Sequence, residues 1–190
     1  MRLLLHSCCC PCLLPVYESL AFRHQVTVFF YNPNIHPVRE FLLREGEVRR
    51  IASQFSIRLI RGPYKPRSWF QRIQGLENEV EGGRRCTECF AMRLEMSCRE
   101  AVAKGFEALA TTLSSSRHKP GQLIDRIGTE LAKKNGLSYV PLAETALDAD
   151  KHGREMCREL KVFRQNYCGC LYSRPAGFEK KKNKGPLSVT

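Results

Sequence analysis

The chain has 190 residues, of which 43% are hydrophobic, 9% aromatic and 26% charged. This composition suits one globular domain with an apolar core, and it excludes wholesale disorder and a collagen-like fibre. Lysine and arginine outnumber aspartate and glutamate by 31 to 19, so the net charge of +12 favours a polyanion such as nucleic acid as the partner. The alternative is a basic surface that is merely solvated.

Short apolar runs alternate with longer amphipathic stretches along the chain. The apolar runs, which we expect to be strands, are residues 2–6, 25–31, 56–60, 106–113 and 137–141. The amphipathic stretches, which we expect to be helices, are residues 13–23, 37–54, 87–104, 121–135 and 150–165. This alternation predicts an α/β fold with a parallel sheet flanked by helices. Because ligands bind at the carboxyl ends of such strands, we expect the site where residues 6–12, 32–36 and 111–119 emerge.

Membrane and secretion signals are missing from the pattern. No apolar run approaches the ~18 residues of a membrane-spanning helix. The first residues lack the apolar region of a signal peptide, because His6 interrupts them. We therefore expect a cytoplasmic protein with no membrane contact, made of one domain over residues 1–173. Residues 174–190, with a lysine-rich run at 180–184, are expected to form a basic extension.

Ten cysteines are the strongest chemical signal, and eight of them fall into three groups. The groups are Cys8, Cys9, Cys10 and Cys12, then Cys86 and Cys89, then Cys168 and Cys170. In a cytoplasmic protein this pattern points to metal binding instead of disulfides. A lone CxxC fits a redox pair or half a zinc site equally well, but three groups hold more thiols than one zinc shell accepts. The count therefore favours iron–sulfur chemistry over zinc.

The order of the elements decides which cysteines reach the sheet edge. Cys86 and Cys89 precede or begin a predicted helix, and helix starts lie at the same edge as the strand ends. Cys168 and Cys170 follow a helix that should end at the opposite edge, so the chain must fold back to bring them in. The first strand-to-helix turn also carries cysteines where phosphate-binding loops carry glycines, and neither GxGxxG nor GxxxxGK[ST] occurs. ATP and dinucleotides are therefore disfavoured.

Three further segments carry polar chemistry. The turn at residues 31–37 can aim His36 into a cleft or can be purely structural. Residues 111–119 gather hydroxyls and cations that suit either a phosphate or a helix start. Residues 49–72 contain seven cations and no acid, interleaved with aromatic side chains, which favours contact with unstacked RNA bases unless the aromatics lie in the core.

Five motifs follow one another in order along the chain. They are His6-Ser7-Cys8-Cys9-Cys10-Pro11-Cys12; Asn34-Ile35-His36-Pro37 with Glu40; Arg85-Cys86-Thr87-Glu88-Cys89-Phe90 with Arg93-Leu94; Thr111-Thr112-Leu113 with Ser116; and Gln165-Asn166-Tyr167-Cys168-Gly169-Cys170 with Ser173. Together they resemble the QueH-type epoxyqueuosine reductases, from residue 2 to about 173.

The resemblance implies a Rossmann-like α/β fold related to the adenine-nucleotide hydrolase-like folds. It implies reduction of the epoxide of epoxyqueuosine to queuosine at the wobble position of tRNA. The partners would be a tRNA anticodon loop carrying epoxyqueuosine and an external electron donor. The metal ligands that it implies are Cys8, Cys9, Cys12, Cys86, Cys89, Cys168 and Cys170. Cys10 stands where the family is expected to carry a small residue, and Cys98 and Cys157 match no motif and are expected to be packing thiols.

Seven ligands exceed what one four-iron cluster needs, so we expect a [4Fe-4S] cluster and a second, adjacent iron ion. Our first choice for the cluster is Cys86, Cys89, Cys168 and Cys170, with Cys8, Cys9 and Cys12 shared between the two centres. His6 and His36 are the candidate proton donors. Two alternatives stay open: a zinc-stapled RNA-binding module without catalysis, and a thiol–disulfide oxidoreductase that uses Cys86 and Cys89.

Overall fold

The computed structural model describes residues 1–173, so the expected basic extension at 174–190 lies outside the described residues. Its centre is a sheet of five parallel strands in the order β3-β2-β1-β4-β5. The strands are β1 (Arg2–Ser7), β2 (Gln25–Phe30), β3 (Arg58–Arg61), β4 (Ala108–Thr111) and β5 (Ser138–Tyr139). All five expected strands are present, and the prediction of a parallel α/β sheet flanked by helices is confirmed.

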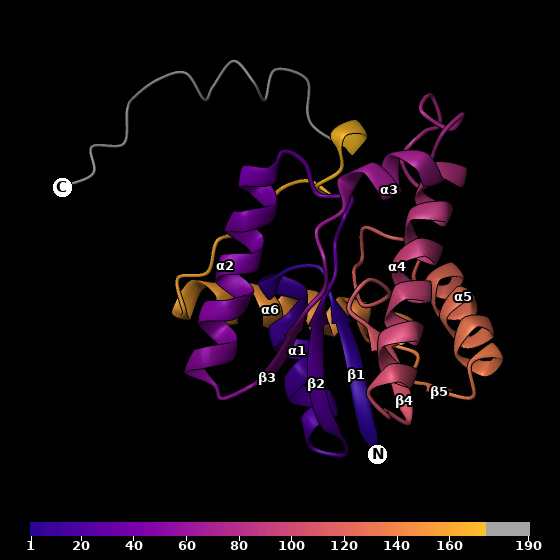
Figure 1. Cartoon of the computed structure of the whole chain (residues 1–190). Helices are drawn as coiled ribbons and strands as arrows, with labels where there is room; N and C mark the ends of the chain where they lie inside the picture. Colours follow the sequence, from indigo (N-terminus) through magenta and orange to yellow (C-terminus); the bar gives the residue numbers. More distant parts are fainter. Residues whose placement is uncertain (174–190) are drawn as a thin grey trace, which may run out of the picture.

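Alternate residues of the strands face two different layers of helices (Figure 1). On β1, Leu3 and Leu5 pack into the core shared with α1 (Cys10–Ala21), α2 (Val38–Gln54) and α6 (Ala146–Glu159). Leu4, between them, packs on the other side with α4 (Arg84–Ala103) and α5 (Gly121–Lys134). Since successive strand residues point to opposite faces, an almost continuous apolar strand is what a sheet covered on both sides requires.

The helix ends differ from the expected ones where proline or backbone conformation decides. The helix α1 begins at Cys10, earlier than expected, with Pro11 in its first turn, where the missing N–H costs nothing. The helix α6 ends at Glu159, so residues 160–165 are not helical as expected. Lys161 adopts a φ of 51°, which a right-handed helix does not allow. Pro66 likewise opens α3 (Pro66–Arg72), a helix that the periodicity did not predict. Two short 3-10 turns complete the described chain, η1 (Ala143–Thr145) and η2 (Leu171–Ser173).

The chain order reverses between β1 and β4, which places a topological switch point at their carboxyl ends. After α6 the chain runs back along α2 to this same edge, and the last described residues lie beside α3 (Figure 1). The fold-back that Cys168 and Cys170 require is therefore present. Within residues 1–173, no helix is long and apolar enough to cross a membrane.

Candidate metal centre and substrate cavity

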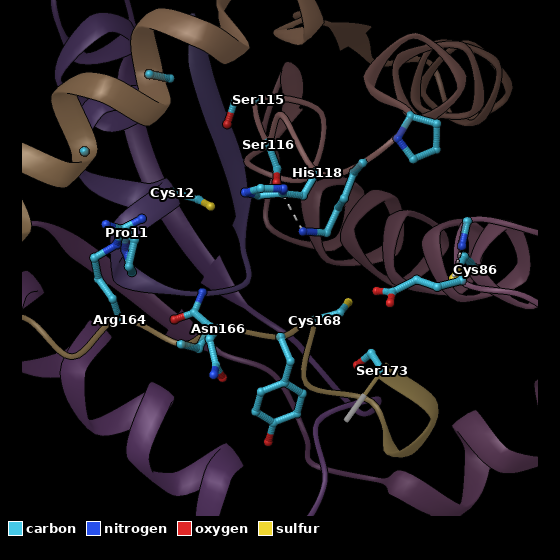
Figure 2. Close-up of a pocket in the computed structure, with 18 of the residues that line it drawn as sticks. Pro11, Cys12, Cys86, Ser115, Ser116, His118, Arg164, Asn166, Cys168 and Ser173 are labelled. Atoms are coloured by element: carbon cyan, nitrogen blue, oxygen red, sulfur yellow. Dashed lines mark hydrogen bonds between the residues drawn. The ribbon is translucent and has the colours of Figure 1, made fainter. Parts of the chain in front are cut away.

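A cavity of about 700 Å³ opens at the switch point, between the segments that follow β1 and β4 (Figure 2). One cysteine from each of the three sequence groups lines it: Cys12, Cys86 and Cys168. Groups far apart in the sequence therefore meet at one place. The remaining polar lining includes Ser115, Ser116, His118, Lys119, Arg154, Arg164 and Asn166. Ligand sites of small molecules have volumes of this order, ~300–1,000 Å³.

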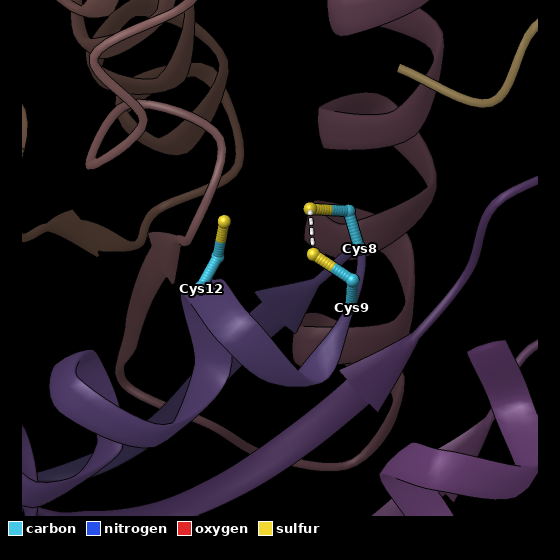
Figure 3. A group of neighbouring side chains, drawn as sticks. All are labelled: Cys8, Cys9 and Cys12. Atoms are coloured by element: carbon cyan, nitrogen blue, oxygen red, sulfur yellow. Dashed lines mark hydrogen bonds between the residues drawn. The ribbon is translucent and has the colours of Figure 1, made fainter. Parts of the chain in front are cut away.

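The first cysteine group is arranged by the turn between β1 and α1. Cys9 is extended (φ −174°, ψ 162°) just before the helix, and Cys12 lies in the first helical turn. The sulfur atoms of Cys8, Cys9 and Cys12 therefore all lie within 4.8 Å of one another (Figure 3). The Cys8 and Cys9 sulfurs are 3.5 Å apart. The next thiol, Cys10, packs instead into the core between the sheet, α1, α2 and α6, which accounts for a cysteine where a small residue is expected.

The second group lies at the start of α4. Cys86 receives a hydrogen bond from the Gly82 N–H to its sulfur at 3.2 Å and packs against the cluster that contains Cys8 and Cys9. Cys89, one turn further along, is buried in a small cluster with Trp69 and Cys170. Trp69 belongs to α3, so the helix missed by the periodicity packs against Cys89 and Cys170; its Pro66 at a helix start was the available signal.

The third group is held by contacts with α2 and with the loop before it. The Arg44 guanidinium donates to the carbonyls of Tyr167 (3.2 Å) and Cys168 (2.9 Å). The His36 N–H donates to the Gly169 carbonyl at 2.8 Å. Gly169 has a φ of +112°, and a Cβ there would lie 2.8 Å from Arg44 Nη1. Only glycine fits this position, so the CxC loop is seated directly on α2.

Two long-range contacts join the third group to the other two. The side-chain amide of Gln165 donates to the Cys9 sulfur at 2.8 Å. Arg85, one residue before Cys86, lies with its guanidinium carbon 4.6 Å from the centre of the Tyr172 ring. Each group of cysteines is thus tied to another by a residue that lies within or beside one of the five motifs.

Burial and neighbouring thiols set the protonation of the cysteines. Hydrogen bonds from Cys12 and Cys9 hold the pKa of Cys8 well below its usual value, while the same contact with Cys8 raises the pKa of Cys12. Burial raises the pKa of Cys89 to about 11. Burial lowers the pKa of Lys119, but the thiolates of Cys168 and the first group outweigh it and raise that pKa. Lys119 also donates to Ser116 at 3.4 Å, drawn in Figure 2 as the dashed line beside Ser116 and His118.

The two histidines named from the sequence lie beside the cavity but do not line it. His6 is fully buried, with Nδ1 2.8 Å from Thr111 Oγ1 and Nε2 3.0 Å from the Tyr31 carbonyl. Burial and the Arg93 charge lower the pKa of His6 to about 4, so the ring is neutral near pH 7. The His36 ring stacks on Phe70 with 4.8 Å between ring centres. A role of either ring as proton donor stays a prediction.

The basic segment at residues 49–72 is divided between core and surface. Trp69 is buried, and Tyr64 stacks on Phe41 and donates to the Ile35 carbonyl. Phe55 and Phe70 are exposed. Several of the cations are paired with carboxylates; these are Arg50, Arg61 and Arg72. The part of the segment that stays available for RNA is therefore smaller than the sequence indicates, and RNA contact there stays a prediction.

The two cysteines outside the motifs occupy the core. Cys98 is fully buried among the side chains between the sheet and α4, and Cys157 is buried between α6 and α1. Both fit the expectation of packing thiols. Their thiols belong to the two apolar layers, whereas Cys12, Cys86 and Cys168 open to the cavity.

The fold and cavity define a doubly wound α/β protein whose switch-point site is built from thiols and cations instead of phosphate-binding glycines. Comparison with known sequences identifies the family. The profile described as epoxyqueuosine reductase QueH matches residues 3–176. The chain therefore belongs to this family, as its five motifs predicted, and the prediction of an oxidoreductase is confirmed.

Relatives with this description occur in several bacteria. The proteins from Acinetobacter baylyi and Haemophilus influenzae are each 39% identical to the chain, over 178 and 174 residues. These alignments cover 90% of this chain in both cases, and 80% and 71% of the relatives. The protein from Thermotoga maritima is 34% identical over 173 residues, which cover 90% of this chain and 88% of that protein.

Two solved structures share the fold at low sequence identity. The U34-tRNA thiolase NcsA from Methanococcus maripaludis, solved with its [4Fe-4S] cluster, has a TM-score of 0.53 at 11% identity over 92% of this chain and 62% of its own. A predicted subunit of tRNA methyltransferase from Methanocaldococcus jannaschii has a TM-score of 0.55 at 12% identity, with 86% and 93% coverage. At these identities the likeness concerns the fold alone.

Proposed function

We propose that the chain reduces the epoxide of epoxyqueuosine, at the wobble position of a tRNA, to the alkene of queuosine. One observation carries the proposal: one cysteine from each of the three groups lines a single cavity that cations also line. Family membership supports the reaction, because the relatives are described as epoxyqueuosine reductases. A tRNA-modifying enzyme works where tRNA is, so we also infer a cytoplasmic location.

The donor set fits an iron–sulfur centre. Seven thiols of the three groups are available once Cys10 is assigned to the core, and one from each group lines the cavity, whereas a structural zinc site is complete with four. We propose Cys86, Cys89, Cys168 and Cys170 as the ligands of a [4Fe-4S] cluster, with Cys8, Cys9 and Cys12 shared with an adjacent iron ion. Sulfur atoms on one tetrahedral metal ion with bonds of about 2.3 Å lie about 3.8 Å apart, and the three sulfurs of this group are within 4.8 Å of one another.

A bound cluster would supply electrons one at a time, and an iron ion with a free coordination position would act as a Lewis acid. Binding and orienting the substrate are the task of the protein residues. The reaction consumes two electrons and two protons, and the epoxide oxygen leaves as water. The electrons come from an external one-electron donor. Because the cavity is lined on several sides by cations and hydroxyls, its residues hold the modified base and orient its epoxide toward the thiol groups.

The position of the substrate in tRNA suits this cavity. The wobble base lies in a single-stranded loop, so it is extruded into a pocket at small cost in stacking. Arg164 and Lys119 at the cavity are placed to contact the flanking phosphates, which are the main source of affinity in nucleic-acid binding. Polar groups such as Asn166 are suited to recognise the modified base, which carries groups that guanine lacks.

The protons require a donor near the epoxide. His6 and His36 are the donors proposed from the sequence, and each has to leave the contacts described above before it reaches the cavity. His118 lines the cavity already. We add it as a second proposal, because a proton donor has to lie within hydrogen-bond reach of the atom that accepts the proton.

The test begins with anaerobic purification followed by iron, zinc and sulfide analysis. The protein is then incubated with dithionite and a tRNA that carries epoxyqueuosine, and the nucleosides are identified by mass spectrometry. We expect iron and sulfide in the protein and a product lighter by one oxygen. Cys86→Ser and Cys89→Ser should lose both iron and turnover, and Cys98→Ser, a matched buried thiol on the same helix, should keep both.

The same experiments discriminate the two alternatives. A zinc-stapled RNA-binding module would contain zinc without iron and would leave the epoxide intact. A thiol–disulfide oxidoreductase based on Cys86 and Cys89 would keep its activity after Cys168→Ser and Cys170→Ser. Either result would overturn the proposed function.

A further inference from the structure

Arg93 is a buried cation locked in place between the cysteine groups. Its side chain is only 1% exposed and lies one helical turn after Cys89 on α4. Its Nε donates to the Cys89 carbonyl at 3.3 Å, and its Nη1 donates to Asn32 Oδ1 at 3.2 Å. Asn32 in turn donates to the Ser7 carbonyl at 2.9 Å, at the end of β1. The guanidinium is thus held to both the second cysteine group and the strand that carries the first.

Among residues 1–173, Arg93 has no carboxylate partner, which is unusual for a charge this deeply buried. Two other arginines of the site are buried: Arg44 is paired with Glu40 at 2.9 Å, and Arg85 donates to the backbone carbonyls of Glu77 and Glu79. Arg93 Nη2 is buried and has no hydrogen-bond partner in the described chain. Since a guanidinium does not lose its proton in proteins and a buried unpaired charge is strongly unfavourable, an anion has to complete its surroundings.

The groups that attract this charge come from all three cysteine groups. They are Cys89, Cys168, Cys8 and Cys170. Thiolates that bind metal carry the negative charge that Arg93 lacks a carboxylate to balance.

We propose that Arg93 is the counter-cation of the metal centre, with Nη2 donating to a sulfur of the centre, and that its charge makes the centre easier to reduce. The inference rests on the proposed function, because it needs a metal centre held by the three cysteine groups. The physical reason is that an added electron increases the negative charge beside a fixed positive charge in a medium of low dielectric constant. Hydrogen bonds to cluster sulfurs and nearby charge are among the factors that set such potentials.

The experiment compares wild type with Arg93→Met, Arg93→Lys and Arg99→Met. Arg99→Met is the matched control, because it removes the same charge from an exposed position on the same helix. Three quantities are measured on anaerobically reconstituted protein: the reduction potential by a titration followed by electron paramagnetic resonance, the rate of iron loss to a chelator, and the Tm with and without metal.

We expect Arg93→Met to lose iron ~10-fold faster, the scale of outer-sphere substitutions. The ratio of reduced to oxidised centre at a fixed potential should fall ~10-fold, which for one electron corresponds to ~59 mV toward more negative potential. The Tm of metal-free Arg93→Met should not fall below that of metal-free wild type, because the substitution removes an unpaired buried charge. The reduction potential of Arg93→Lys should stay close to that of wild type. Arg99→Met should match wild type in all three measurements.

Three results would overturn the inference. An unchanged potential in Arg93→Met would show that its charge does not act on the centre. A drop in Tm of the metal-free protein alone, with iron retention unchanged, would make Arg93 a packing residue. If the wild-type protein binds iron but has the same potential and the same rate of iron loss as Arg93→Met, this inference fails and the proposed function stands. If the wild-type protein contains no iron, both fail.

Discussion

The first and third cysteine groups reach the same cavity by different means. Cys8, Cys9 and Cys12 lie within five consecutive residues, and one strand end and one helix start bring their sulfurs together. The loop at residues 168–170 is placed instead by Arg44 and by the backbone of His36, more than 120 residues away in sequence. The position of the first group is therefore set by local geometry, whereas the position of the third group depends on the packing of α2 against the returning chain.

The largest expected effect concerns the first cysteine group, whose geometry is local. Cys10 and Cys12 are two residues apart but face opposite sides of α1, so they form a matched pair. Cys12→Ser should lose the iron that the first group holds and all turnover. Cys10→Ser should retain both and lower the free energy of unfolding by about 1–3 kcal/mol, because it buries a hydroxyl in an apolar layer. Iron analysis and urea unfolding measure the two effects, and iron loss in both variants would break the comparison.

Arg44→Met tests the third cysteine group, which contacts distant in sequence hold in place. The substitution leaves Glu40 buried without its partner and frees two carbonyls of the third cysteine group. Breaking a buried ion pair on one side costs about 3–5 kcal/mol, so the variant should unfold at much lower urea concentration. The double variant Glu40→Met with Arg44→Met should recover part of that loss without recovering iron. Equal stability of the single and double variants would contradict the assigned role of the pair.

A smaller effect is expected from Gly169→Ala, with Gly136→Ala as its control. Both glycines have positive φ, but nothing lies within 4 Å of a Cβ at Gly136, whereas a Cβ at Gly169 meets Arg44. The control should cost about 1–2 kcal/mol from backbone strain alone. Gly169→Ala should cost a further 1–3 kcal/mol, on the order of overpacking, and should weaken iron retention. Similar values for the two variants, from thermal unfolding, would show that the loop is free to shift off α2.

The smallest effect is expected on the surface between α6 and α1. His152 Nε2 lies 2.8 Å from a Glu18 oxygen, and both side chains are largely exposed. Exposed pairs contribute about 0–1 kcal/mol, so His152→Ala should change unfolding by less than that and leave iron content unchanged. A larger loss would mean that α6 depends on this contact, and with it the part of the cavity wall that α6 supplies.

The sequence predicted all five strands and the five helices that it named, because the spacing of apolar residues is visible in the sequence and prolines mark helix starts. It missed α3, whose seven residues are too short for a helical period to stand out. It also placed the end of α6 too late, because a φ of 51° at Lys161 has no signature in the side chain. For the basic segment at 49–72 the pattern favoured RNA contact and left open that Trp69 is a core residue; Trp69 is buried against Cys89 and Cys170.

By itself the sequence determined the chemistry of this protein: ten thiols in a recognisable spacing, a positive charge, and a family whose motifs lie in order. Those are covalent properties, and folding does not change them. Only the tertiary structure decided that Cys10 belongs to the core and Cys12 to the cavity, and that Arg93 pairs with no carboxylate of residues 1–173. Burial and pairing depend on which distant segments share a layer, and a one-dimensional pattern does not contain that information.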